Sequence, residues 1–527
     1  MNEWVLPSTT LLPVLPAVAA IFASPSVSRR SARRLGVGTA VSVLVLAILT
    51  TWAWYLSGEA PAADRFDPGQ WLLGAPLLMI DELNALLLPF AALIFLFVAL
   101  AQPSTEAIEN SLRQMLLAEA VTIAAFLSAD PLVLAALWCL SVLGGWYGLR
   151  RQSNGNHGGV RIFCCYMLPS CVLILLGAGL MKIGVSSAAA AMIAVAVMIR
   201  KGIVPLHSWL PELFARAPLP LSVLFNAPQI GAWVAVRLVA PHAPLWVLEV
   251  ISLASLLTAV HGAGMALVQM DPRRVLGWLF LSQSALILVG LGSQAAIAQA
   301  GGLAMWMSSG LALAGFGMTI AALEARRGPL SLREFAGGYE RKPLLAVCFL
   351  VLGLASVGFP GTLGFVAQEA LVHGVVNDFP YFGFAILIAS MLNGITVLRT
   401  YFVLFCGRVD PSRVTQGLRR REQVAFVALV ALLVTGGLFP GLVLRLHGAS
   451  RCGEEPCART SLRRAANLHL DETPIRTAAA RHQLLVPPLL PSSDRETRSC
   501  QPFATCGEFI GARHSALDQR LQVSPWR

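Results

Sequence analysis

The chain has 527 residues, of which 56% are hydrophobic and only 13% are charged. A soluble globular protein carries about 25% charged residues, so this chain has too few to cover a surface in water. The net charge is +11, but most Arg residues before the tail lie in short segments between apolar runs and form no basic patch interleaved with aromatic residues. This pattern argues against a nucleic-acid-binding protein and for a membrane protein.

About fourteen apolar runs are long enough to cross a membrane, because one helical span needs about 20 apolar residues. The first run precedes its positive charges, which predicts a first helix rather than a cleavable signal peptide. We therefore expect an all-α membrane protein with helices near 9–25, 36–57, 76–101, 112–129, 131–149, 161–183, 186–206, 217–240, 244–268, 273–293, 295–324, 341–373, 380–405 and 421–446.

The positive charges alternate between successive loops. One set of loops holds most of the Lys and Arg residues, whereas the opposite set, up to residue 446, holds only Arg65 and Lys182. Cytoplasmic loops are enriched in Lys and Arg, so the asymmetry predicts which face is inside. We expect a multi-pass protein of the inner (plasma) membrane with both termini on the outer (periplasmic) face.

Two apolar stretches contain residues that interrupt a helix. Prolines crowd the segment 200–220, and Gly358, Pro360 and Gly361 lie inside the segment 358–369. Pro removes a backbone donor and clashes with the preceding turn. A broken helix at membrane depth needs protein or a water-filled cavity to satisfy its freed backbone groups, and paired breaks in two repeats mark transport sites. The breaks fall five helices apart and predict two five-helix repeats.

The breaks and the composition divide the chain into five segments. From about residue 447 the polar sequence has little periodicity, which is typical of a disordered tail. Four tail cysteines, Cys452, Cys457, Cys500 and Cys506, can form disulfides in an oxidising compartment or remain free thiols. The segments are transmembrane helices 1–3 (1–111), a first repeat of helices 4–8 (112–240), a second repeat of helices 9–13 (241–405), the last transmembrane helix (406–446) and the tail (447–527).

Lys201 is the strongest candidate for a functional residue. The chain has only three lysines, Lys182, Lys201 and Lys342, and its other Lys or Arg residues are all arginines. Lys201 lies in a mostly apolar segment one turn before Pro205, where a buried ammonium is costly unless it is hydrated, paired or neutralised. A lysine can lose its proton when buried and an arginine practically cannot, which suits a proton relay. The alternative is an interfacial lysine that reaches the cytoplasmic edge, as we expect of Arg200.

Further polar residues could extend a proton pathway around Lys201. His207 titrates near neutral pH and follows by six residues, although it could instead bond freed carbonyls. A carboxylate in the middle of a helix, such as Glu119, must be protonated, paired or hydrated. We expect His261 to be a core histidine and Glu249 to be interfacial or functional. The remaining candidates are Asp81 near the start of the third helix, and Gln368 and Glu369 after the second break, with Arg399 as a possible partner of Glu369.

No phosphate-binding glycine loop, zinc signature or catalytic triad is apparent, and the cysteines have no convincing iron–sulfur spacing. The six cysteines in apolar segments have the character of small hydrophobic residues. We therefore assign no catalytic, cofactor-binding or metal-binding residues, and no cofactor, to this chain. Its expected partners are the lipid bilayer and other membrane subunits, without nucleic acid.

The segment from Lys201 to Ala227, KGIVPLHSWLPELFARAPLPLSVLFNA, resembles a motif of the antiporter-like membrane subunits of respiratory complex I. That family includes the L, M and N subunits of NADH:quinone oxidoreductase and subunits of energy-converting hydrogenases and Mrp-type sodium/proton antiporters. Residues 265–284, 358–366 and 79–89 are also similar to family segments, so the resemblance covers about residues 76–405. It implies fourteen helices with two inverted five-helix repeats, and a proton-carrying role for Lys201.

The sequence departs from the family at several titratable positions. Cys139 follows Trp138 where the family usually has Glu, and Glu119 could replace that carboxylate as the partner of Lys201. The other departures are an uncharged residue near Asn226 or Ala232 for the eighth-helix Lys or His, Ser309 for a His, and Gln368 for the twelfth-helix Glu or Lys. The family's long lateral helix is also absent, which argues against an L-type subunit.

Three functions are compatible with these residues. The first is a proton-translocating subunit of a complex I-like or hydrogenase-like assembly, driven by redox chemistry in its partners and without a redox site of its own. The second is a transport-inactive structural paralogue, which the missing titratable groups favour. The third is an ion-transport subunit with a non-redox partner, for Mrp-type cation/proton antiport or inorganic-carbon uptake, in which sodium could replace the proton.

Overall fold

The computed structural model describes the membrane-embedded part of the chain. The chain divides into two compact units, Met1–Asp471 and Glu472–Arg527, and every described residue belongs to the first. The predicted tail, 447–527, with its four cysteines, lies outside the described residues. The described residues are 9–23, 29–57, 61–64, 67, 69–70, 74, 76–103, 108–152, 158–335, 337, 339, 343–376, 380–407 and 417–439.

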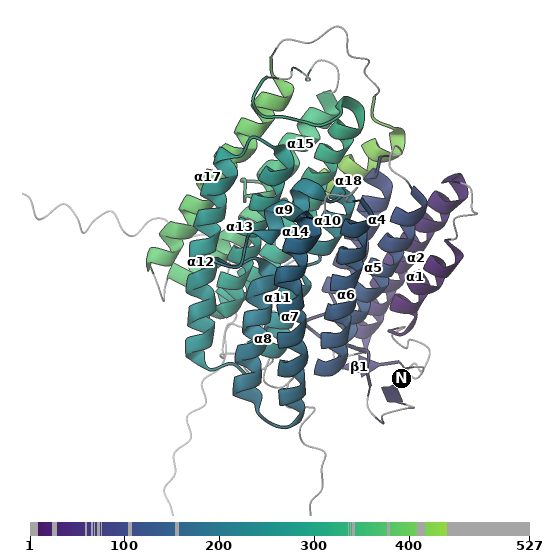
Figure 1. The fold of residues 1–527 in the computed structure, drawn as a ribbon, viewed down its shortest axis with the longest axis vertical. Coiled ribbons are helices and arrows are strands. Elements are labelled where there is room, and N and C mark those ends of the chain that lie inside the picture. Colours follow the sequence, from purple (N-terminus) through teal and green to yellow (C-terminus); the bar gives the residue numbers. More distant parts are fainter. Residues whose placement is uncertain are drawn as a thin grey trace, which may run out of the picture. The chain divides into compact units, whose positions relative to one another are not determined.

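The described residues form long helices that run side by side (Figure 1). A two-stranded antiparallel sheet, β1 (Ala62–Ala63) with β2 (Met79–Ile80), lies at one end of the helices. The helices of the first half are α1 (Leu11–Phe22), α2 (Arg29–Leu56), α4 (Leu87–Ala101), α5 (Ile108–Leu127), α6 (Pro131–Gln152), α7 (Gly158–Lys182), α8 (Ser186–Lys201), α9 (Trp209–Arg216), α10 (Leu219–Asn226), α11 (Ile230–Val234) and the π-helix η1 (Ala235–Val239).

The second half is also helical and contains the most deeply buried elements. Its helices are α12 (Leu245–Val268), α13 (Pro272–Gly292), α14 (Ala296–Arg327), α15 (Pro343–Ser356), α16 (Leu363–Val376), α17 (Pro380–Phe405) and α18 (Arg420–Leu438). Nearly all of α13 and α14 is buried, whereas α2, α7 and α17 each expose an apolar face. A helix that is apolar all round belongs in the interior, and an exposed apolar face fits contact with lipid.

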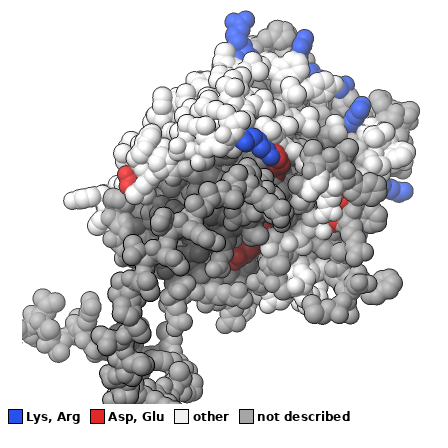
Figure 2. Space-filling view, turned by 90° about the horizontal axis from the view of Figure 1, so that it is seen from below, with Lys and Arg blue, Asp and Glu red and all other residues white. Residues whose placement is uncertain are grey.

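This is a multi-pass membrane protein. Within the described residues, nine helices are long and apolar enough to cross a membrane, and four apolar helices are shorter. The all-α class is confirmed, while the predicted count of about fourteen spans is higher than these nine. The difference arises because several predicted spans are divided or shortened by breaks. Figure 2 looks at the lower end of Figure 1 and shows a mostly uncharged described surface.

Close helix packing depends on small residues in the interior. A Cβ atom added to Gly301 on α14 would lie 2.4 Å from the backbone nitrogen of Leu371 on α16. Without a side chain at this position the two backbones can approach, as small residues allow in membrane helices. The predicted break in the span 341–373 is confirmed, because this span consists of two helices, α15 and α16, with positive φ angles at Gly358 (82°) and Gly361 (85°) between them.

The prediction of a helix from residue 76 is wrong, because a polar turn delays α4 until Leu87. Asp81 accepts hydrogen bonds from the backbone nitrogens of Leu83 (3.1 Å) and Asn84 (3.0 Å), and Asn84 accepts one from the Asp81 backbone nitrogen (2.8 Å). The other Asp81 oxygen forms a buried ion pair with Arg237 of η1. Asp81 therefore ties the start of the third predicted helix to the π-helix.

This ion pair predicts a measurable stability difference. Arg237→Met leaves a buried carboxylate without its cation, which costs about 3–5 kcal/mol. We expect a clear fall in the thermal unfolding midpoint in detergent, with partial recovery in Arg237→Met/Asp81→Asn. Lys182→Met is the matched control, because Lys182 pairs with Asp130 at an exposed position, where such a pair contributes about 0–1 kcal/mol. Equal effects of the two single substitutions would contradict the assignment.

Candidate functional site

Lys201 is the last residue of α8 and lies inside the bundle, with 4% of its surface exposed. Gly202 ends the helix in the left-handed conformation (φ 70°, ψ 36°), which glycine adopts without steric cost. The chain then crosses residues 202–208 without regular helix before α9 begins at Trp209. The predicted break in this helix is confirmed, and it leaves Lys201 at a helix C-terminus, where a positive charge is favoured.

The backbone groups freed by this break find partners within the protein. The indole nitrogen of Trp209 donates to the carbonyl of Ile199 (2.9 Å), and the backbone nitrogen of Val204 donates to the Thr258 hydroxyl (3.0 Å). Such compensation is what allows a broken helix at membrane depth.

A second break faces Lys201 and was missed by the sequence prediction of one helix over 217–240. Here α10 ends at Asn226 and α11 begins at Ile230. Between them Gln229 has φ 61° and ψ 44°, a strained conformation for a residue other than glycine. The Pro228 carbonyl accepts a hydrogen bond from the Trp306 indole (3.0 Å). Pro228 inside an apolar run was the sequence signal for this break.

The two breaks meet where the Lys201 ammonium donates a hydrogen bond to the side-chain oxygen of Gln229. Beside this pair is a cavity of about 20 Å³, which Asn226 and Ser284 also line. A volume of about 10–15 Å³ is enough for one water molecule if polar groups surround it. The site is thus a buried lysine with an uncharged partner and room for water.

Arg200, next to Lys201, is also buried rather than reaching the cytoplasmic edge as expected. Its guanidinium lies over the rings of Trp138 (4.5 Å) and Phe225 (4.6 Å) and donates to the Ser141 hydroxyl (2.9 Å). It lines a cavity of about 430 Å³ between α5, α6 and α10. Arg200, Phe225 and Ile230 line both cavities, so the two cavities adjoin at these side chains.

Glu119 is fully buried on α5, and neither of its carboxylate oxygens has a hydrogen-bond partner within the protein. The expected pairing of Glu119 with Lys201 is therefore not formed, since Lys201 bonds to Gln229 instead. A buried carboxyl group without a cation is more stable in its neutral form. Glu119 remains a separate proton-binding candidate in the first half of the molecule.

His207 lies beside a histidine that the sequence placed in the core. The rings of His207 and His261 are 5.3 Å apart, and both contact the Trp278 ring, at 5.4 and 5.7 Å. His207 is half-buried, but His261 is exposed on α12, so the prediction of a core histidine is wrong. The two histidines are 54 positions apart, and no local sequence pattern could have joined them.

The candidates after the second break do not form the expected pair. Gln368 is buried beside Gly358, where an added Cβ would lie 2.1 Å from its side-chain oxygen, whereas Glu369 is exposed. Arg399 donates to the carbonyls of Leu267 and Gln269 rather than to Glu369. The hydrogen bonds and ion pairs among the described residues link none of the six predicted pathway residues to another.

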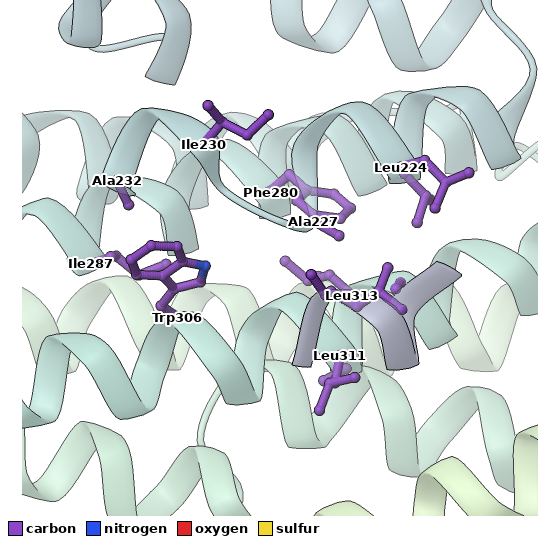
Figure 3. Close-up of a cluster of buried hydrophobic side chains, with 14 of the residues drawn as sticks. Leu224, Ala227, Ile230, Ala232, Phe280, Ile287, Trp306, Leu311 and Leu313 are labelled. Carbon is purple, nitrogen blue, oxygen red and sulfur yellow. The ribbon is translucent and has the colours of Figure 1, made fainter. Parts of the chain in front are cut away.

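Apolar side chains fill the space between α10–α11 and the second half. Figure 3 shows Ala232 close to Ile287 and Trp306 there, with Ile230 farther from them. The Ser309 hydroxyl donates to the Met305 carbonyl of its own helix (2.6 Å). A row of charged side chains therefore does not cross this part of the described interior.

The fold and site define a class of protein: a polytopic membrane protein in which two broken helices enclose a buried lysine. The chain belongs to the family described as NADH:quinone oxidoreductase/Mrp antiporter, TM, whose model matches residues 93–393.

Curated relatives support this membership. Subunit M of the F(420)H(2) dehydrogenase of Methanosarcina mazei is 27% identical over 250 residues, which are 46% of this chain and 50% of that protein. NADH-quinone oxidoreductase subunit M of Pseudomonas aeruginosa is 28% identical over 268 residues, 49% of this chain and 52% of that protein. The chain thus spans about half the length of the curated relatives it matches.

Solved structures share the fold. A chain of respiratory complex I from Thermus thermophilus matches with a TM-score of 0.73 and 23% identity, covering 87% of this chain and 99% of that one. A chain of the Mrp complex from Dietzia matches with a TM-score of 0.72 and 20% identity, covering 86% and 97%. The antiporter-like fold of complex I is therefore established for this chain.

The contact between Lys201 and Gln229 predicts strong coupling between the two side chains. Gln229→Leu leaves the buried ammonium without its partner, at a cost of about 1–3 kcal/mol. Once Lys201 is replaced by Met, the same change at Gln229 should cost much less. The measurement is a double-mutant cycle of unfolding free energies in detergent, and additive effects would contradict a direct contact.

Proposed function

We propose that this chain is the proton-translocating, antiporter-like membrane subunit of a complex I-like NADH:quinone oxidoreductase or a related redox-driven assembly. The observation that carries the proposal is Lys201, buried at the meeting point of two broken helices. Discontinuous helices in membrane transporters surround sites where ions bind, and an ionisable residue at such a place is functional by default.

The uncharged partner suits Lys201 to proton exchange. A carboxylate partner would hold the ammonium form and would be left unpaired when the lysine loses its proton. The Gln229 amide is neutral, so it can accept a hydrogen bond from the ammonium without keeping a charge after deprotonation. Water in the adjoining cavity is the group that would accept or deliver the proton.

We also propose roles for the other candidate residues of the proton pathway. His207 and Glu119 are proposed as proton-binding groups of the first half, and Gln368 and Glu369 as polar groups of the second. Asp81 is proposed to act through its ion pair with Arg237 of η1. This pair fixes the helix that follows Gln229 and α11. The fixed charge of Arg200 between the two cavities would oppose leakage of hydronium toward Lys201.

The proposed setting is a multi-subunit complex of the inner membrane, with both termini outside and two inverted repeats of helices 4–8 and 9–13. The paired breaks at α8–α9 and α15–α16 support the repeats. The printed names of the related chains, complex I, the F(420)H(2) dehydrogenase and the Mrp complex, support partners that are membrane subunits.

Specific observations also support two alternative functions. A transport-inactive scaffold is favoured by the absence of a Glu119–Lys201 pair and by the apolar packing around Trp306. Ion transport with a non-redox partner, either Mrp-type antiport or inorganic-carbon uptake, remains the third function. The match to the Mrp complex favours the antiport form.

Proton flux in sealed vesicles tests the proposal. The tagged chain is purified with its native partners, reconstituted, and energised by NADH and quinone or by an imposed sodium gradient while a pH-sensitive dye is followed. We expect Lys201→Ala to reduce the flux to that of protein-free vesicles, because Lys201 is the buried ionisable group at which the two breaks meet. Glu119→Gln should lower the flux as well.

Lys182→Ala is the matched control, because this lysine pairs with Asp130 at the exposed end of α7. It should leave the flux unchanged. If Lys201→Ala also leaves the flux unchanged in an intact complex, the chain is a scaffold. A flux that appears only with the sodium gradient would instead favour antiport.

A further inference from the structure

Buried polar atoms without partners gather where α12 meets α17. The hydroxyls of Ser252, Ser255 and Ser390 and the side-chain oxygen of Asn393 have no hydrogen-bond partner within the protein. Native proteins contain few such atoms, and each calls for an explanation. Ordered water is the usual partner of otherwise unsatisfied buried groups. The two helices lie side by side (Figure 1), and their boundary is therefore suited to hold water.

A triplet on α13 connects this boundary to Lys201. Ser284 lines the Lys201 cavity. Ser282 donates to the Ala259 carbonyl of α12 (2.8 Å) and accepts from the Asn393 side-chain nitrogen of α17 (2.8 Å). Between them Gln283 is fully buried, and its amide nitrogen and oxygen both lack partners. Successive helical residues are about 100° apart, so the triplet carries polar groups from one side of α13 to the other.

From Ser282 the polar groups continue toward one end of the bundle. On α12, Ser255 and Ser252 are one turn apart, and on α17, Ser390 is one turn from Asn393. Ser252 then lines a cavity of about 710 Å³ together with Glu249 and Ser293. This cavity lies where α12 and α17 begin and α13 ends, which is the end poor in Lys and Arg.

We propose that protons leave Lys201 along this row of hydroxyl and amide groups, with Glu249 as the final titratable group at the mouth. We call the row Ser282, Asn393, Ser390, Ser255 and Ser252 the serine–asparagine seam. The inference rests on the proposed function and names its exit path. The Lys201 ammonium gives its proton to water, and O–H bonds then break and form in turn along the water molecules that the seam holds. One proton is moved, and no group is oxidised or reduced.

The seam explains how protons could cross the second half although Ser309 and Gln368 stand where the family has titratable residues. Hydroxyl and amide groups can donate and accept hydrogen bonds to water without taking up charge. A chain of water molecules along these groups can conduct protons without a fixed charge. The positions of Ser309 and Gln368 therefore do not need titratable residues. The apolar packing around Trp306 of α14 is then no obstacle, because Ser282 connects the seam to α12 and α17 instead.

Flux measurements on seam variants test the inference, with Lys201→Ala measured in parallel. Ser255→Val and Asn393→Leu replace polar groups with apolar ones and should each lower the proton flux at least about tenfold. Ser255→Thr keeps the hydroxyl and should retain most of the flux. The matched control is Thr319→Val, which removes a buried hydroxyl of α14 that only bonds the Phe316 carbonyl of its own helix. Copurification of the partners shows that each complex is assembled.

Thiol modification gives a readout that a purely structural role would not move. In a background without other cysteines, Ser252→Cys and Ser255→Cys should react with a small water-soluble methanethiosulfonate, and the reaction should block the flux. Thr319→Cys should not react. If Ser255→Val and Asn393→Leu keep full flux while Lys201→Ala loses it, the seam is overturned and the proposed function stands. If the wild type carries no more flux than Lys201→Ala, the proposed function fails, and the seam fails with it.

Discussion

The contact between Lys201 and Gln229 is the constraint on which the site depends. It joins the end of α8 to the start of α11, so both helices must stop at the same depth in the bundle. A buried ammonium requires a partner or water, and a glutamine in a left-handed conformation is costly unless its surroundings hold it there. Each break therefore supplies a contact that stabilises the other.

Tryptophan side chains make these breaks possible in an apolar interior. Trp209 and Trp306 each donate an indole hydrogen to a carbonyl beside a break, and Trp233 donates to the Ala125 carbonyl of α5 (2.8 Å). An indole combines a large apolar surface with one donor, so it satisfies a freed carbonyl without bringing in charge. The apolar packing and the irregular backbone are thus parts of one arrangement.

The two halves of the molecule differ in the polar side chains that they bury. The first half buries ionisable groups, Lys201, Arg200 and Glu119, and the first two are held by neutral or aromatic partners. The second half buries one ion pair, Arg326 with Glu422, and its interior around α12, α13 and α17 contains serines and amides, several of them without protein partners. If the chain carries protons as proposed, hydration rather than a row of charges would decide where they move in the second half.

The sequence by itself determined the membrane class, most helix positions, the breaks near Pro205 and Gly358, and the position of Lys201 beside the first break. These follow from local properties: apolar run length, helix-breaking residues and the cost of a buried charge. Only the tertiary structure decided the partners. Gln229 rather than Glu119 bonds Lys201, Arg237 pairs with Asp81, and His261 contacts His207. Such pairings depend on how distant helices cross and at what depth, which no local pattern encodes.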